Sequence, residues 1–134
     1  RLCSSAASDV YKRQIDNLVS DSIAKDAQDQ FSMRIIDRIK VYGKETPVAV
    51  YEIISEVGNT SHKENDLIKH FEKGFEAYTQ GKFSAGLKHF QKSRPLEIDR
   101  GYPSSPSDVY ISRCKMLENS PPDNWDGTWI LESK

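Results

Sequence analysis

The stretch FSMRIIDRIKVYGKETPVAVYEII, residues 31–54, decides how this chain folds. Apolar and charged side chains alternate through its first half, which predicts a strand with one buried face over residues 31–42. Asp37 interrupts the apolar face, which otherwise consists of Met33, Ile35, Ile39 and Val41. The opposite face is polar and consists of Arg34, Arg38, Lys40 and Tyr42.

A turn at Gly43–Thr46 follows, and Pro47 begins a return strand where its missing N–H costs least. The return strand VAVYEII, residues 48–54, is apolar on both faces. A hairpin with one half-exposed and one buried strand is expected beside a sheet that helices cover. Two strands alone are barely stable, so we expect the rest of that sheet to lie outside this sequence.

Upstream of the hairpin, residues 15–19 form a short apolar stretch, the signal of a weak strand. Ser20 and Asp21 can then cap a helix with Ile23, Ala24 and Ala27 on one side.

Residues 1–14, RLCSSAASDVYKRQ, show neither a structural period nor the apolar core of a signal peptide. We interpret them as a translated adapter or assembly artefact, the alternative being a disordered native tail. The first interpretation removes Cys3 from the chemistry and implies that the natural protein continues upstream.

Downstream, residues 55–65 are predicted to be a polar linker. After it, apolar residues recur at the spacing of a helix. A first helix, closed by Gly81, carries the stripe Leu67, Phe71, Phe75 and Tyr78. A second helix has Gly86 where the two would cross, and Pro95 is expected to end it. Its apolar stripe is Phe83, Leu87 and Phe90.

The last part of the chain predicts one more helix and a short strand. A polar loop, residues 97–106, precedes a helix start formed by Ser105, Pro106 and Asp108. The buried side of this helix is expected to be Tyr110, Cys114 and Leu117, and Pro121-Pro122 stops it. Asp126-Gly127 then predicts a turn into an apolar strand. We expect Trp125, Trp129 and Ile130 to pack on the helices.

Composition excludes several classes of protein. The chain has 134 residues, the size of one ordinary domain, with 19 Lys and Arg against 20 Asp and Glu. This balance gives no support to nucleic-acid binding through a broad basic surface. No apolar run is long enough to cross a bilayer. Two cysteines cannot form a disulfide scaffold, so a reducing, cytoplasmic setting is expected.

Other chemistry-bearing residues have plain structural interpretations. The three histidines His62, His70 and His89 lack metal-ligand spacing, and Asp123, Asp126 and Glu132 do not form a calcium loop. Cys114 lies on an apolar stripe, so we expect a core residue and not a nucleophile. Trp125 and Trp129 are either a peptide-binding platform or anchors of the tail, and we favour anchors.

The hairpin resembles the closing hairpin of class III nucleotide cyclase domains, the adenylate and guanylate cyclases. That family commonly ends in a charged strand, a KGK-type turn, a proline and a VYE-type strand. The matching residues here are Asp37-Arg38, Val41, Gly43-Lys44, Pro47-Val48 and Val50-Tyr51-Glu52. The resemblance covers residues 15–56, roughly the last third of such a domain.

The second half resembles a single tetratricopeptide unit followed by the WDG tail of many bacterial cyclases. The matching small and aromatic positions are Gly74, Gly81, Phe83, Gly86, Phe90 and Ser93. Together the resemblances imply an α+β chain in which a remnant of a ferredoxin-like cyclase domain precedes a tetratricopeptide-like helix hairpin, a third helix and a short strand. The implied organisation is a tail over residues 1–14, the cyclase part over 15–56 and a helical tail over 57–134.

The cyclase resemblance implies a parent enzyme that converts ATP, in preference to GTP, into the cyclic nucleotide and pyrophosphate. Such a parent would use Mg²⁺ or Mn²⁺ and pair with a second cyclase domain as a homodimer. The family's metal-binding aspartates, base-reading residues and Asn/Arg pair all lie upstream of this hairpin. The resemblance therefore implies no catalytic, cofactor-binding or metal-binding residue in this piece.

One candidate contribution to the substrate remains in the turn. The family sometimes binds the triphosphate with the first lysine of the KGK turn, a position that Tyr42 occupies here. Lys40, Tyr42 and Lys44 therefore form a candidate phosphate-binding face. The alternative is that all three are solvated edge residues.

Two hypotheses of function follow. In the first, the chain is the inactive C-terminal fragment of a cytoplasmic nucleotide cyclase, whose membrane anchor, if it has one, lies upstream. In the second, it is a helical protein-interaction or regulatory module attached to a degenerate cyclase domain. The upstream coding sequence separates them, because only an active parent needs the metal-binding aspartates.

Overall fold

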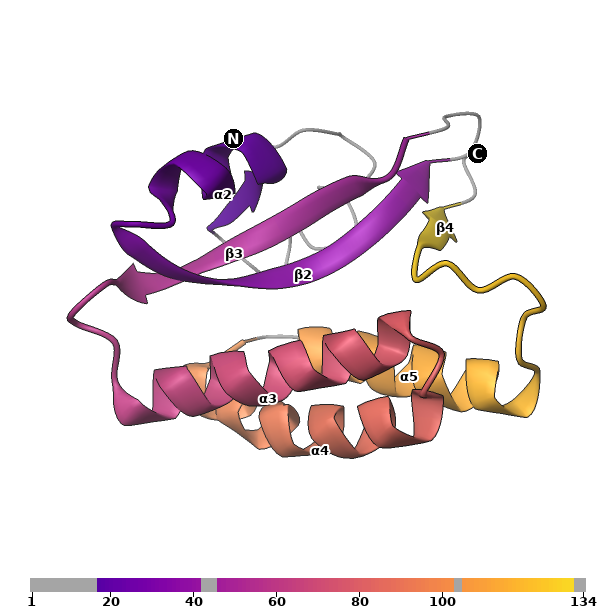
Figure 1. Cartoon of the computed structure of the whole chain (residues 1–134). Coiled ribbons are helices and arrows are strands. Elements are labelled where there is room, and N and C mark those ends of the chain that lie inside the picture. Colours follow the sequence, from indigo (N-terminus) through magenta and orange to yellow (C-terminus); the bar gives the residue numbers. More distant parts are fainter. Residues whose placement is uncertain (1–16, 42–45, 103–104, 132–134) are drawn as a thin grey trace. The chain divides into compact units, whose positions relative to one another are not determined.

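The computed structural model describes residues 17–41, 46–102 and 105–131, and the chain is α+β, as predicted (Figure 1). The chain consists of two compact units. The helical unit is His62–Gly127. The sheet unit consists of the residues before His62 together with those from Thr128 onward, so it is built from both sides of the helical unit in the sequence.

The sheet unit contains β1 (Leu18–Ser20), α2 (Asp21–Ala27), β2 (Phe31–Val41), β3 (Val48–Glu56) and β4 (Trp129–Leu131). The strand order is β1-β3-β2-β4. β3 pairs antiparallel with both β1 and β2, whereas β4 pairs parallel with the end of β2. The strand, helix and hairpin expected before residue 57 are all present.

The start of α2 follows the predicted capping. The Ser20 hydroxyl accepts a hydrogen bond from the Ile23 N–H at 3.4 Å, and Asp21 adds a negative charge in the first turn. Ala24 is buried. This local arrangement depends only on neighbouring residues, which is why the sequence predicts it well.

The predicted faces of β2 are wrong in its first part. A β-bulge places Ile35 opposite Tyr51 and Asp37 opposite Val50, so Ile36 is an extra residue. An extra residue shifts the side-chain alternation by one position. The buried residues are therefore Arg34, Ile36, Asp37 and Ile39, whereas Met33 and Ile35 are only half-buried.

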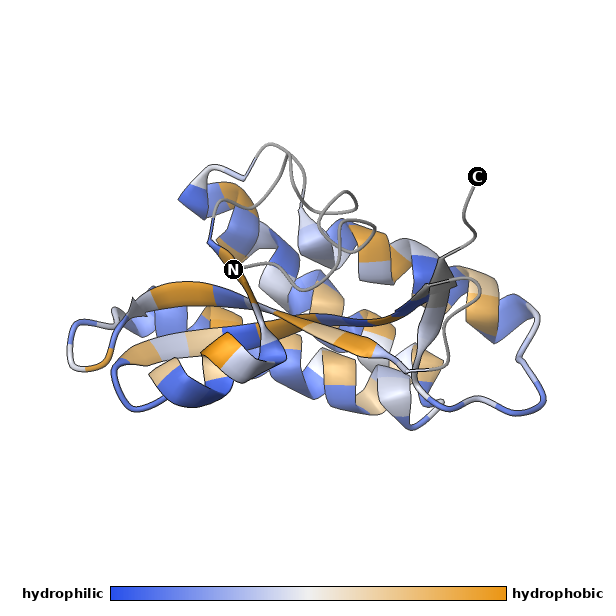
Figure 2. Cartoon of the chain, turned by 90° about the horizontal axis from the view of Figure 1, so that it is seen from above, coloured by the Kyte–Doolittle hydropathy of each residue, from blue (hydrophilic) through white to orange (hydrophobic). Residues whose placement is uncertain are grey.

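Apolar residues recur along the long strands of the sheet unit (Figure 2), and β3 has them at both alternating sets of positions, as the sequence predicts. Val50, Glu52 and Ile54 are buried on one face, and Tyr51 and Ile53 are half-buried on the other. The strand extends to Glu56, so the predicted polar linker is shorter than residues 55–65. The connection between β3 and the helical unit covers residues 57–61.

The helical unit contains α3 (His62–Thr79), α4 (Phe83–Arg100) and α5 (Pro106–Asn119). The predicted stripe of the first helix is confirmed, with Gly74 added to it. Ser105 caps α5 as predicted, since its hydroxyl accepts a hydrogen bond from the Asp108 N–H at 3.3 Å. On the buried side of α5, Tyr110 and Cys114 are buried as expected. Leu117 is half-buried, and Arg113 is buried instead.

Pro95 does not end the second helix, contrary to the prediction. α4 continues for five residues beyond it and stops at Gly101, whose φ of 90° is left-handed and whose N–H bonds to the Ile98 carbonyl at 2.9 Å. The extension brings Glu97 into the buried side of the helix. Leu87 is half-buried, and the buried positions are Phe83, Gly86, Phe90, Ser93 and Glu97.

Aromatic side chains from all three helices form the core of the helical unit. Tyr110 of α5 stacks on Phe90 with ring centroids 4.7 Å apart, and it meets Tyr78 edge-on at 4.9 Å. Phe71 meets both Phe90 and Tyr110 edge-on, at 5.2 and 5.6 Å. Such offset and edge-on pairs add specific geometry to apolar burial.

Candidate functional site

Of the candidate phosphate-binding face, only Lys40 lies among the described residues. Lys40 is half-buried in β2, and its backbone pairs with Ile130 of β4. Tyr42 and Lys44 lie outside the described residues. The role of these three side chains in binding phosphate therefore stays a prediction.

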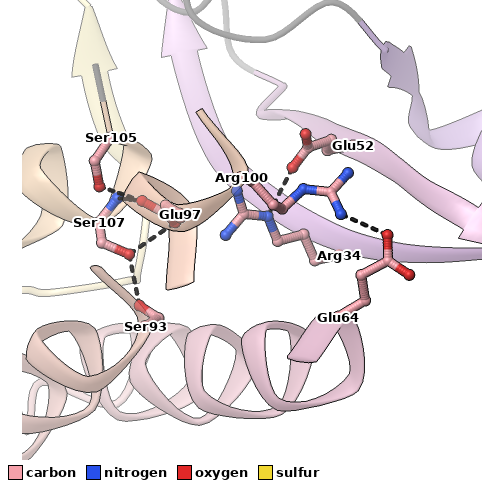
Figure 3. A network of polar contacts seen from close by, with 8 residues as sticks. All are labelled: Arg34, Glu52, Glu64, Ser93, Glu97, Arg100, Ser105 and Ser107. Carbon is pink, nitrogen blue, oxygen red and sulfur yellow. Dashed lines mark hydrogen bonds and ion pairs between the residues drawn. The ribbon is translucent and has the colours of Figure 1, made fainter. Parts of the chain in front are cut away.

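The sheet unit contains a buried ion pair that the sequence does not predict. Arg34 Nε and Glu52 Oε1 are 2.8 Å apart, and the two side chains are 0% and 5% exposed (Figure 3). The residues are direct partners across β2 and β3. Removing one member would leave a buried charge uncompensated, which is strongly unfavourable. The pair could have been found only after the register of the hairpin was known.

A second buried polar cluster lies in the helical unit, where α4 meets the start of α5 (Figure 3). The Glu97 carboxylate accepts hydrogen bonds from the Ser107 N–H at 2.9 Å, from the Ser107 hydroxyl at 2.8 Å and from the Ser105 hydroxyl. The hydroxyls of Ser107 and Ser93 are 2.5 Å apart. All four residues are buried.

This cluster has a structural explanation. A helix N-terminus presents unpaired N–H groups and a partial positive charge, which a carboxylate satisfies. Charge-assisted hydrogen bonds make such a contact strong. Glu97 therefore fixes α5 to α4.

The histidines lie apart from these clusters. His62 is exposed at the start of α3, 3.7 Å from Asp66. His70 and His89 are half-buried, and within the described part of the chain their Nδ1 atoms are buried without a hydrogen-bond partner. Desolvation lowers the pKa of His89, and the positive charges of Lys92 and Lys73 lower it further.

The remaining sequence candidates for metal or nucleophilic chemistry are accounted for as follows. Cys114 is buried, as predicted, and desolvation raises the pKa of its thiol to about 12. A thiol with so high a pKa is a poor nucleophile. Over residues 17–41, 46–102 and 105–131, no group of three or more His, Cys, Asp or Glu side chains could hold a metal ion.

The two tryptophans of the tail belong to different units. Trp125 belongs to the helical unit, where its ring meets Tyr78 and Phe83 edge-on at 5.1 and 5.4 Å. Trp129 belongs to the sheet unit, where it begins β4 and its backbone pairs with Ile39 of β2, so its packing on the helices stays a prediction. Ile130 follows it in the same strand. The interpretation of the pair as anchors thus holds for Trp125, at the end of α3.

The sheet unit also has a cavity of about 430 Å³ between α2 and the strands. Three of its residues belong to α2 and Gln28 follows the end of that helix, and the others are apolar or aromatic residues of β2 and β3. The lining is Asp21, Ala24, Lys25, Gln28, Phe31, Met33 and Tyr51. None of these residues was a candidate site residue from the sequence.

No family model, curated protein or solved structure matches this chain. None of the described helices has the length and apolar character that a membrane span requires.

Proposed function

We propose that this chain is the C-terminal part of a class III nucleotide cyclase, made of the end of the catalytic domain and a helical regulatory extension. The observation that carries the proposal is the β2–β3 hairpin together with its sequence motif. The antiparallel register pairs Ile39 with Val48, so the cyclase-like GKETP sequence falls between the two paired strands. Pro47 directly precedes β3, where a proline does not interrupt the pairing.

The order of elements also supports the proposal. A short strand and a short helix, β1 and α2, precede the hairpin, as the resemblance to the cyclase family implies. The compact helical unit follows, and Trp125 and Gly127 of the WDG motif close it. In this proposal, a protein partner would bind to the helical unit.

The proposed chemistry belongs to the parent enzyme. Cyclisation of ATP needs carboxylates that hold Mg²⁺ or Mn²⁺ and cations that offset the charge of the phosphates. Lys40 of β2 and Lys44, in the sequence between β2 and β3, would supply cations at the phosphates, and Tyr42 would supply a hydroxyl. A second cyclase domain would complete the site in the homodimer.

The test begins with the upstream coding sequence, followed by expression of the full reading frame and an assay with Mn-ATP. We expect two metal-binding aspartates upstream and formation of cyclic AMP. Replacing Lys44 by alanine should lower kcat/KM by about tenfold, the cost of one charge-assisted hydrogen bond. Lys63→Ala is the matched control, because the Lys63 side chain of α3 is exposed and pairs with Asp99 in the helical unit.

A full-length protein without these aspartates and without cyclase activity would overturn the proposal. The helical protein-interaction module attached to a degenerate cyclase domain would then be the better description.

A further inference from the structure

The cavity of the sheet unit has two chemically different walls. One wall consists of the side chains of Phe31, Met33 and Tyr51 from β2 and β3, and the other belongs to α2. The three strand residues are only half-buried, so each can bury more apolar surface against a ligand. The volume of about 430 Å³ lies in the range of cavities that hold small molecules.

The wall from α2 carries one charge of each sign. Asp21 and Lys25 are four positions apart, and residues at this spacing are neighbours on a helix surface, with Cβ atoms about 5–6 Å apart. Gln28 follows the helix with helical backbone angles, φ −63° and ψ −23°, so it continues the same side. All three residues are exposed, which leaves their polar groups accessible from solvent.

The two charges are not used within the chain. Among the described residues, neither Asp21 nor Lys25 forms an ion pair, with each other or with any other side chain. Both charges complement the dipole of α2, since the acid lies in the first turn and the base in the last. The dipole explains their positions along the helix, but it does not explain why both line a cavity whose opposite wall is apolar and aromatic.

We propose that this cavity binds a free α-amino acid with a large apolar or aromatic side chain. The ammonium and the carboxylate of such a ligand lie on one carbon atom, so two neighbouring side chains of opposite charge can bind both. Asp21 accepts hydrogen bonds from the ammonium, and Lys25 donates to the carboxylate. The ligand's side chain packs on the ring and thioether groups of the strand wall.

The charges favour this class of ligand over others. A nucleotide or another polyphosphate would place several negative charges beside Asp21, with Lys25 alone to offset them. A simple cation would be repelled by Lys25, and a simple anion by Asp21. A zwitterion satisfies both side chains at once.

Titration of the full chain with L-phenylalanine, followed by proton–nitrogen correlation NMR, tests the site. We expect a Kd on the order of 0.1–1 mM, which suits a ligand of this size. The shifts should concentrate in the amides of residues 21–28, 31–33 and 51. No saturable shift up to about 10 mM would overturn the proposal, as would shifts that concentrate elsewhere in the chain.

Three analogues test which groups of the ligand are recognised. 3-Phenylpropanoate lacks the ammonium and 2-phenylethylamine lacks the carboxylate, so each should bind about tenfold more weakly through the loss of one charge-assisted contact. L-Alanine lacks the ring and should also bind at least about tenfold more weakly. If L-phenylalanine binds no more tightly than these analogues, the cavity does not recognise an α-amino acid and the proposal is wrong.

Two substitutions assign the charges to their partners. Lys25→Gln should weaken L-phenylalanine about tenfold without weakening 2-phenylethylamine, and Asp21→Asn should weaken L-phenylalanine about tenfold without weakening 3-phenylpropanoate. Asp26→Asn is the matched control, because Asp26 is exposed on α2 but does not line the cavity. It should leave all affinities unchanged.

Equal weakening of every ligand by Lys25→Gln and Asp21→Asn would contradict the assignment of the charges. If a substitution unfolds α2, the comparison of ligands on the wild-type chain still decides the outcome. No nucleotide enters these measurements, so their result is independent of the proposed function.

Discussion

Two glycines mark the crossing of α3 and α4, and their surroundings differ. A Cβ atom on Gly74 would lie 2.9 Å from the ring of Phe90, which is fully buried and stacked on Tyr110. A Cβ atom on Gly86 would lie 3.2 Å from the Gly74 carbonyl and 3.5 Å from Cys114 Sγ.

We expect Gly74→Ala to destabilise the protein by about 1–2 kcal/mol. Overpacking of a core costs about 1–3 kcal/mol, which the better helix propensity of alanine offsets in part. Gly86→Ala should stay within about 1 kcal/mol of the wild type, because the propensity gain opposes a milder crowding. Chemical denaturation of both variants measures the difference. A Gly74→Ala protein as stable as the wild type would contradict the packing argument.

His89 should make the protein sensitive to mild acid. Its pKa is lower in the folded protein than its ordinary value of about 6.5, because the ring is desolvated and lies near Lys92 and Lys73. The unfolded chain therefore binds a proton more readily, so stability is full above about pH 6.5 and decreases as the pH falls below it. The loss levels off below the pKa of the folded state.

The Tm of His89→Gln should accordingly decrease less than the Tm of the wild type when the pH is lowered from 7.5 to 5.5. Thermal melts at the two pH values measure this. His62→Gln is the control, because the His62 side chain is 92% exposed. If His89→Gln keeps the full acid sensitivity of the wild type, His89 is not its source.

Among the elements, α4 and α5 depend on each other through Glu97. The last turn of α4, beyond Pro95, buries the Glu97 carboxylate against the start of α5. The N–H of Ser107 and the hydroxyls of Ser105 and Ser107 all donate to it. The helix end and the helix start are therefore one structural feature.

Glu97→Ala should destabilise the helical unit by roughly 2–3 kcal/mol, because it leaves buried donors without an acceptor. Glu118→Ala, on the exposed side of α5, is the control and should change stability by less than about 0.5 kcal/mol. Chemical denaturation followed by far-UV circular dichroism compares the two. Equal effects of the two substitutions would show that the Glu97 cluster is not what joins α5 to α4.

For the molecule as a whole, the sheet unit contains the end of the proposed catalytic domain, and no residue of this sequence matches the family's metal-binding aspartates. Purified residues 15–134 should therefore form no cyclic nucleotide from Mg-ATP or Mn-ATP. The assay needs an active cyclase as its positive control. Turnover above the buffer blank that persists through repurification would contradict the view that this is the C-terminal part of a larger enzyme.

The sequence by itself determined the features that depend on neighbouring residues. The stripe of Leu67, Phe71, Phe75 and Tyr78 predicts α3 because a helix brings these spacings onto one face. The caps at Ser20 and Ser105 need only a hydroxyl and the N–H three residues later. The candidate phosphate-binding face also came from the sequence, through its motif, although of its three residues only Lys40 lies in the described part of the chain.

The tertiary structure decided what depends on distant partners. The bulge at Ile36 moves Arg34 onto the buried face of β2, where Glu52 neutralises its charge. The alternation of apolar and polar residues within β2 does not reveal the bulge. Glu97 extends α4 beyond Pro95 because its hydrogen-bond donors come from α5. β4 pairs with β2 although some ninety residues separate Ile39 from Trp129 in sequence, and a strand of three residues is stable only on the edge of an existing sheet.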